Sequence, residues 1–315
     1  MTPTSFTRRT DAQRSRQPKK IAIGLLCAAI NLSGLLASAS VARAQASTRD
    51  RVGVPDSLSI VATPTPADSS PPWVTKRELL GAGLSVLATI AVSPLDKPVA
   101  SELQDARWQK DEPLHSASQV LAFAGGPGPF FLGAGFFAVG RITGAPALSD
   151  AGEHITEAVV LAAGITALGK GIAGRALPGV QTSESFEWAR GFHRGNGPFV
   201  SFPSGHTAAG FAMASALTEE AGAWRPGLEH FVGPAAYLTA SAIGLARLYQ
   251  HVHWVSDLPL AAAIGTWSGL AVESHVHRRR RGGTVTRIVE AATVQRTSNG
   301  GTLIGMSIPF GGSSR

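Results

Sequence analysis

The chain has 315 residues, with 28 Lys and Arg against 21 Asp and Glu, a formal charge of +7 and one cysteine. Residues 1–44 hold seven of the basic residues and one acid, so the rest of the chain is nearly neutral. This distribution, with Cys27 alone, argues against a nucleic-acid-binding domain, a disulfide scaffold and a cysteine-ligated metal site. An apolar content of 44% argues against a disordered chain.

The beginning of the chain has the pattern of an export signal. A basic stretch precedes an uncharged run, and Ala42-Arg43-Ala44 then offers the small–x–small pattern of a cleavage site. We predict a signal peptide over residues 1–44, with an uncleaved N-terminal anchor as the alternative. Either form exports the next segment to the bacterial cell envelope. A chain without other cysteines suits this oxidising compartment, because it has no thiol to oxidise.

The remainder divides into a linker and an apolar core. Residues 45–76 are rich in Pro, Ser and Thr, which predicts a linker. Residues 77–277 are apolar and show no β-alternation, so we predict an all-α fold, a helical bundle of about six core helices. The six apolar segments are 79–93, 117–140, 155–172, 205–217, 231–249 and 257–275. The second contains GGPGP, which predicts two short helices or one kinked helix.

Residues 278–315 form a basic run followed by a tail. Four arginines come first, at 278–281, and the last 30 residues alternate weakly around Asn299-Gly300. This pattern is typical of a small C-terminal β-hairpin, and an irregular tail is the alternative.

A histidine and a carboxylate stand four residues apart near the end of the core, at His253 and Asp257. On one face of a helical turn, the carboxylate can accept the Nδ1 proton and leave Nε2 as a basic nucleophile. Arg247, six residues earlier, can approach the same region with a fixed positive charge. Taken alone, this stretch favours the simpler interpretation, an ordinary arginine and a solvated His–Asp pair at a helix end.

The sequence Pro-Ser-Gly-His at 203–206 precedes an apolar helix. Unpaired N–H groups at a helix start, with the Ser204 hydroxyl, make an anion site, and Gly205 lets the backbone approach the anion closely. His206 stands at its edge as a candidate general acid. The alternative is that Ser204 is only an N-cap and His206 a surface histidine.

Lys170 and Arg175 offer further positive charge near the end of the third apolar segment. A lysine after a long apolar run is costly without a partner, although it can also extend its amine to the helix end. The remaining histidines form no ligand spacing, and we assign them no role.

Three stretches occur in a fixed order: KGIAGRALP at 170–178, PSGH at 203–206 and RLYQHVHWVSD at 247–257. Together they resemble the signature of the type 2 phosphatidic acid phosphatase superfamily, which includes class A acid phosphatases and vanadium haloperoxidases. Its pattern is Lys-x6-Arg-Pro, then Pro-Ser-Gly-His, then Arg-x5-His-x3-Asp. The resemblance covers roughly residues 79–276.

The resemblance implies a metal-independent phosphatase that hydrolyses a phosphomonoester, on a lipid or a soluble molecule, through a phosphohistidine. It makes His253 the nucleophile, Asp257 its orienting partner and His206 the general acid. The expected phosphate-binding residues are Lys170, Arg175, Ser204, Gly205 and Arg247.

The first stretch departs from the pattern, because Leu177 stands where the family has a phosphate-binding arginine. Leucine cannot donate a hydrogen bond, so one charge-assisted contact is missing, which leaves a weakened enzyme as an open alternative. Arg175, or Arg190 or Arg194 of the following loop, could take its place.

Two other functions remain open: a vanadium-dependent haloperoxidase, and a weakened envelope protein that binds lipid phosphate. The phosphatase needs no cofactor and should be inhibited by vanadate, whereas the haloperoxidase uses vanadate as its cofactor. In each case the partner is a phosphorylated small molecule, a lipid phosphate or vanadate rather than a nucleic acid.

The apolar runs lack a polar face, so we expect membrane association with the site facing the periplasm, and a soluble periplasmic domain is the alternative. An exported N-terminus followed by six crossings would, however, leave Lys170 facing the cytoplasm. We therefore expect that segment 79–93 is too short to cross, that segment 117–140 is re-entrant, or that the domain is soluble.

Overall fold

The computed structural model describes residues 76–180, 185, 197–279, 292–296 and 302–306. The predicted signal peptide, all but the last residue of the predicted linker, and the candidate arginines Arg190 and Arg194 lie outside these residues.

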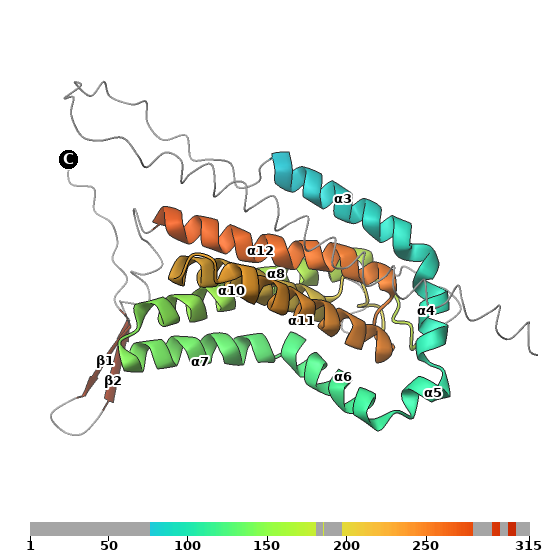
Figure 1. The fold of residues 1–315 in the computed structure, drawn as a ribbon, viewed down its shortest axis with the longest axis horizontal. Helices are drawn as coiled ribbons and strands as arrows, with labels where there is room; N and C mark the ends of the chain where they lie inside the picture. Colours follow the sequence, from blue (N-terminus) through green and yellow to red (C-terminus); the bar gives the residue numbers. More distant parts are fainter. Residues whose placement is uncertain (1–75, 181–184, 186–196, 280–291, 297–301, 307–315) are drawn as a thin grey trace, which may run out of the picture. The chain divides into compact units, whose positions relative to one another are not determined.

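The described core is built of helices, which confirms the all-α prediction (Figure 1). Its elements are α3 (Lys76–Val92), η1 (Ser93–Leu95), α4 (Asp96–Leu103), α5 (Ala106–Gln109), α6 (Glu112–Gly125), α7 (Gly128–Thr143), α8 (Pro146–Ala173), α10 (Gly205–Trp224), α11 (Glu229–Tyr249), η2 (Val255–Asp257) and α12 (Leu258–Arg279). Each of the six predicted segments contributes helix. The short helices η1, α4 and α5 were not predicted. Pro94 and Pro98 lie in the first turns of η1 and α4, where proline is tolerated.

The GGPGP sequence does divide its segment into two helices. α6 and α7 meet at an angle of 56°. Gly126, the C-cap of α6, has φ −100° and ψ −102°, and Gly128 begins α7. The sequence break is therefore a real bend in the chain, and it lies beside the site described below.

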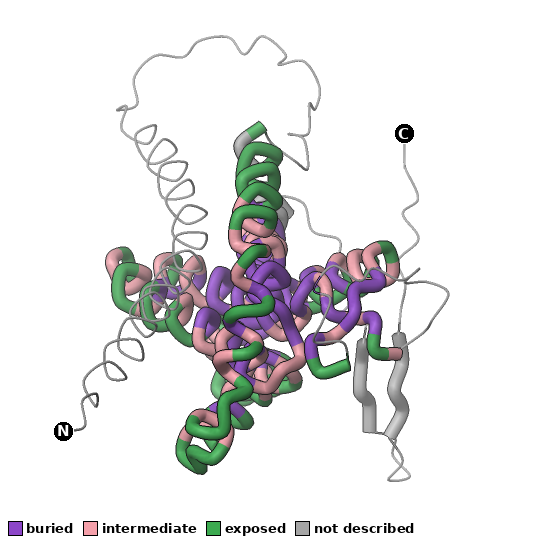
Figure 2. The backbone as a smooth tube through the Cα atoms, turned by 90° about the vertical axis from the view of Figure 1, so that its right-hand side faces the viewer, coloured by how far each residue is buried: buried purple, intermediate pink, exposed green. Residues whose placement is uncertain are grey.

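α10 is the buried centre of the bundle, packed between α8 and α11, whereas α3 and α7 are exposed along much of their length (Figure 2, purple and green). Small residues allow the central helices to approach closely. A Cβ added at Gly265 of α12 would lie 2.2 Å from the carbonyl oxygen of Ala208 on α10. Large buried side chains, among them Phe211, Ile243 and Leu258, fill the remaining space.

Four segments of the described chain are long and apolar enough to cross a membrane: Leu79–Leu103, Pro146–Ala173, Glu229–Tyr249 and Val255–Ser274. The bent pair α6–α7 is a fifth if it crosses as one unit. Large apolar side chains such as Leu79, Phe131 and Phe231 are more than 60% exposed, as in helices that face lipid. These features support membrane association. The first segment, which seemed too short from residues 79–93, reaches 25 residues because it continues through α4.

The chain divides into two compact units after Ala271, within α12. In the second unit, β1 (Ala292–Arg296) and β2 (Thr302–Met306) pair antiparallel, with Val294 opposite Ile304. The two strands flank Asn299-Gly300, as the alternation predicts.

Because α12 and α10 are in close contact at Gly265, we predict that alanine is tolerated less well there than at the exposed glycine Gly135. Gly265→Ala should lower stability by about 1–3 kcal/mol, because backbone must move to admit the methyl group. Gly135→Ala is the matched control: nothing lies within 4 Å of its added Cβ, and alanine favours a helix. Thermal unfolding of both variants measures the difference, and equal midpoints would contradict the packing described.

Candidate active site

His253, in the loop that follows α11, lies beside Asp257, the last residue of η2. The distance from His253 Nδ1 to Asp257 Oδ2 is 3.3 Å, and both residues are buried. They do not share an α-helical face as predicted, because α11 ends at Tyr249 and His251 adopts a left-handed φ of 60°. The loop nevertheless gives the expected geometry, in which the carboxylate holds the Nδ1 proton and Nε2 is left for chemistry.

Ser204 is the N-cap of α10 and is completely buried. Its Oγ accepts hydrogen bonds from Thr207 N at 3.4 Å and from Thr207 Oγ1 at 2.9 Å. The hydroxyl proton therefore remains available for an anion in front of the helix. The role of N-cap and the role of anion donor are thus compatible.

Lys170 reaches the same helix start from the last turn of α8. A Cβ added at Gly205 would lie 3.8 Å from Lys170 Cε, so the lysine stem passes over the beginning of α10. Its amine donates to the carbonyl oxygen of Val200. The ammonium and the N–H groups of α10 therefore lie at one place, where they can hold an anion together.

Arg247 enters from the last turn of α11, and Gln250 holds its guanidinium. Arg247 Nη1 donates to Gln250 Oε1, and Gln250 Nε2 donates to the carbonyl oxygen of Ser118 on α6 at 2.9 Å. Arg247 Nε is buried and has no hydrogen-bond partner among the residues that the structure describes. A buried guanidinium N–H without a protein partner is suited to an anionic ligand.

His206 lies in the first turn of α10, against the bend between α6 and α7. A Cβ added at Gly126 would lie 3.0 Å from His206 Nε2, so glycine at the bend gives the ring its space. Burial lowers the pKa of His206 to about 4, helped by the positive charges of Arg247 and Lys170. Burial also lowers the pKa of His253, although Asp257 opposes this effect. Without a ligand, both imidazoles are therefore neutral at pH 7.

Arg175 is not placed as we expected. Its side chain is 1% exposed and lies in the wall behind Asp257, where Nη1 donates to Asp257 Oδ1 at 2.6 Å and Nη2 donates to Asp96 Oδ2 at 2.7 Å. Its spacing from Lys170 suggested a phosphate contact, but a guanidinium committed to two buried carboxylates is directed away from the phosphate.

Leu177 stands where the family has a phosphate-binding arginine, and no arginine among the described residues replaces it. Its N–H donates to the carbonyl oxygen of Pro198 at 2.8 Å, and its side chain has no donor. Because Arg175 is engaged elsewhere, the fixed positive charge that acts on His206 comes from Lys170 and Arg247.

A cavity of about 230 Å³ opens beside these residues. It is lined by Gly125, Gly126, Phe130, Val159, Ala163, Thr166, Ala167, Lys170, Gly205, His206 and Ala209. Its polar side chains are Thr166, Lys170 and His206, and the rest of the lining is apolar or glycine. The cavity therefore offers contacts to an anion and to an apolar group.

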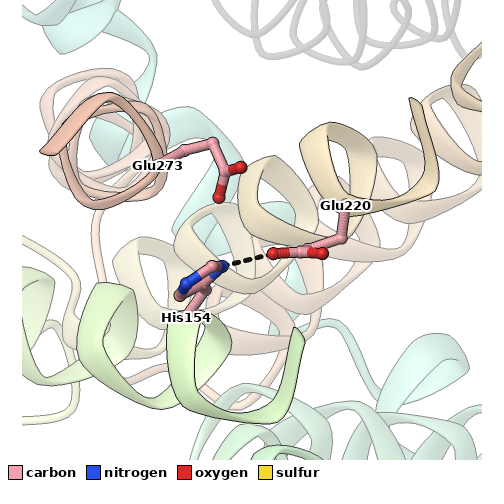
Figure 3. Close-up of side chains that lie close together, drawn as sticks. All are labelled: His154, Glu220 and Glu273. Carbon is pink, nitrogen blue, oxygen red and sulfur yellow. Dashed lines mark hydrogen bonds and ion pairs between the residues drawn. The ribbon is translucent and has the colours of Figure 1, made fainter. Parts of the chain in front are cut away.

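A separate buried pair ties α8 to α10 about 24 Å along α8 from Lys170, at a rise of 1.5 Å per residue. His154 Nδ1 bonds the Glu220 carboxylate, and Figure 3 shows the two side chains facing one another. The pair was not foreseen, because its partners are 66 residues apart.

Comparison with known proteins identifies the core. Residues 154–281 match the model of the PAP2 superfamily, and this range contains every residue of the three motifs. These residues are a PAP2-superfamily region. The resemblance drawn from the motifs is thereby confirmed.

Two known proteins are similar to this chain. The lipid A 1-phosphatase of Porphyromonas gingivalis is 39% identical over 69 residues, which are 22% of this chain and only 15% of that relative's length. The structure of a transmembrane PAP2-type phosphatidylglycerolphosphate phosphatase from Bacillus subtilis matches with a TM-score of 0.43 and 21% identity. The match covers 65% of this chain and 96% of that one.

Several residues of the site carried no sequence signal. Asp96, Ser118 and Ser201 lie outside the three motifs, and Gln250 lies within the third without being part of its pattern. Only the structure shows their contacts: Asp96 with Arg175, Ser118 with Gln250, Ser201 with Asp257, and Gln250 with Arg247. The GGPGP break was the one available signal for the bend next to His206.

The low pKa of His206 predicts a proton-linked anion site. A bound phosphate should raise this pKa above 4, so the complex takes up a proton and affinity should rise as the pH falls from 7 towards 5. The rise should approach about tenfold per pH unit below the pKa of the complex. Calorimetric titration with inorganic phosphate measures it. His206→Asn serves as the comparison, because the ionisation of phosphate itself is common to both proteins; identical pH dependence in the two would contradict the assignment.

Proposed function

We propose that this chain is a phosphatase that hydrolyses a lipid phosphomonoester through a phosphohistidine intermediate. The observation that carries the proposal is the convergence of two histidines on one site that can hold an anion. His253 is oriented by a buried carboxylate, and His206 lies at the start of α10. Lys170 and Arg247 supply fixed positive charge to the same site.

In the first step, His253 Nε2 attacks phosphorus and the bond to the leaving oxygen breaks. His206, protonated because the phosphate raises its pKa, gives its proton to that oxygen. Asp257 stabilises the positive charge that develops on His253. In the second step, His206 takes a proton from water, the oxygen attacks phosphorus, and the P–N bond breaks to release phosphate.

The phosphoryl oxygens are held by positive charges and hydrogen-bond donors that are in place before the substrate binds. Lys170, Arg247, the Ser204 hydroxyl and the N–H of Gly205 surround the position in front of α10. Such preorganised donors stabilise charge as it redistributes in the transition state. We therefore propose a reaction that needs no metal ion, with vanadate acting as an inhibitor.

A lipid is the substrate class that the surroundings of the site favour. Phe130, Val159 and Ala163 give the cavity an apolar wall next to Lys170 and His206. Several helices of the described chain are apolar enough to cross a membrane. The name of the Porphyromonas relative also states a lipid as its substrate.

The helix directions bear on which side of the membrane holds the site. α8 and α11 end at the site, and α10 and α12 begin there. α3 leads to the same end, because Asp96 directly follows η1 and contacts Arg175. If the site faces the periplasm and α3 crosses the membrane, the start of α3 is on the cytoplasmic side. An export signal would instead place the start of α3 on the periplasmic side.

We keep the periplasmic site, because a run of four arginines at 278–281 begins in the last residues of α12, and basic residues favour the cytoplasmic side. If α3 crosses the membrane, the export signal is the prediction that must give way.

Loss of the nucleophile gives the first test. His253→Ala should abolish hydrolysis of an aryl phosphate, because the described site has no second imidazole oriented by Asp257 that could attack phosphorus. His251→Asn is the matched control: His251 is two residues away, and asparagine tolerates its left-handed backbone. Full activity in His253→Ala would contradict the proposed mechanism.

The missing arginine gives the second test. Leu177→Arg should tighten the binding of phosphate or vanadate about tenfold or more, since it adds one charge-assisted hydrogen bond. Leu177→Met, which adds length without charge, should leave the inhibition constants unchanged. Equal inhibition of all three proteins would mean that another arginine already fills this role.

A further inference from the structure

The wall behind the nucleophile contains a buried charge network that joins three distant parts of the chain. Arg175 Nη1 donates to Asp257 Oδ1 at 2.6 Å and to Ser256 Oγ at 2.8 Å, and its Nη2 donates to Asp96 Oδ2 at 2.7 Å. Nε and Nη2 also donate to the carbonyl oxygen of Ser185, at 2.8 and 2.6 Å. Each charged member is at most 1% exposed.

Asp96 comes from the first turn of α4, outside the residues that match the PAP2 superfamily. Its Oδ1 accepts from Ser256 N at 2.9 Å, and its Oδ2 accepts from Ser256 Oγ at 2.7 Å. Ser256 directly precedes Asp257, so Asp96 holds the backbone of the carboxylate that orients His253. An apolar contact would anchor α4 at a lower desolvation cost than a charged group.

The two oxygens of Asp257 have different partners. Oδ1 is held by Arg175, and Oδ2 accepts from Trp254 N at 2.8 Å, from Ser201 Oγ and from His253 Nδ1. Arg175 therefore fixes the rotation of the carboxylate that directs Oδ2 towards the histidine. The Arg175 guanidinium also lies 5.6 Å from the centre of the Trp254 ring, which restrains it from another side.

The network contacts His253 through Asp257, whose negative charge opposes the effect of Lys170 and Arg247 on the pKa of the imidazole. Asp257 and Arg175 alone would nearly cancel, and His253 would face a neutral pair. Asp96 adds a second buried negative charge, so that the three groups together present one net negative charge to the imidazole. A negative environment stabilises the positive charge that develops on His253 when it attacks phosphorus.

We propose that Asp96 and Arg175 are positioning residues for His253: Arg175 orients Asp257, and Asp96 keeps the net charge behind the nucleophile negative. This inference rests on the proposed function for its kinetic consequences. Its effect on the ionisation of His253 requires no turnover and can be measured separately.

The test compares Asp96→Asn with Asp105→Asn. Asparagine keeps the size of Asp96 and one acceptor oxygen but removes the charge. Asp105 is exposed and caps α5, so its substitution removes a nearby charge without touching the network. Asp96→Asn should lower kcat about tenfold to a hundredfold with little change in KM, as for other residues that support a reacting group from behind. Asp105→Asn should leave both unchanged.

A pH profile separates positioning from a merely structural role. His253 attacks as the neutral imidazole, and removal of a negative charge lowers its pKa, so the acid limb of kcat/KM in Asp96→Asn should move to lower pH. Ser256→Ala removes a hydrogen bond to Asp96 and no charge, so it should reduce stability without moving that limb. Arg175→Lys, which keeps the charge but not the fork, should retain more activity than Arg175→Met.

NMR titration of ¹³C-histidine-labelled protein gives the second readout and keeps the inference testable if Asp96→Asn is poorly active. The His253 midpoint should move to lower pH in Asp96→Asn and stay in place in Asp105→Asn. An unchanged midpoint, or wild-type kcat with an unchanged acid limb, would overturn the inference. An inactive wild-type protein whose His253 midpoint still responds to Asp96→Asn would instead overturn the proposed function alone.

Discussion

The buried carboxylate of Asp257 is the constraint on which the rest of the site depends. It is completely buried, and its charge is compensated by hydrogen bonds from Arg175, Ser201, Trp254 and His253. A buried charge with this many partners is fixed in position, whereas the loss of one partner is costly. The His253 imidazole is therefore oriented by a network that extends well beyond its own loop.

The helical bundle serves this network by bringing four helix ends to one place. Lys170 lies in the last turn of α8, Ser204 caps α10, Arg247 lies in the last turn of α11, and Asp257 directly precedes α12. Tight crossings such as that at Gly265 hold these ends together, and the bend after α6 brings backbone against His206. Positive charge and N–H groups thus surround one position before any phosphate binds, which is the arrangement that lowers the cost of charge redistribution.

The sequence predicted the parts of the site that depend on local spacing. His253 and Asp257 are four residues apart, and the Pro-Ser-Gly-His motif places Ser204 and His206 at a helix start, so short-range geometry sufficed. It failed for Arg175, because spacing located the residue but could not show that its guanidinium faces two carboxylates. Asp96 could not be found at all, since a contact over 79 residues leaves no local pattern.

The central claim is that His253 carries the phosphoryl group during the reaction. Acid-labile, alkali-stable label should appear on the protein within one turnover when a ³²P-labelled phosphomonoester is mixed with enzyme and quenched in alkali. The account predicts stoichiometric label on the peptide that contains His253, and none in His253→Asn. Label on another residue, or a full burst of product with no labelled protein, would contradict it.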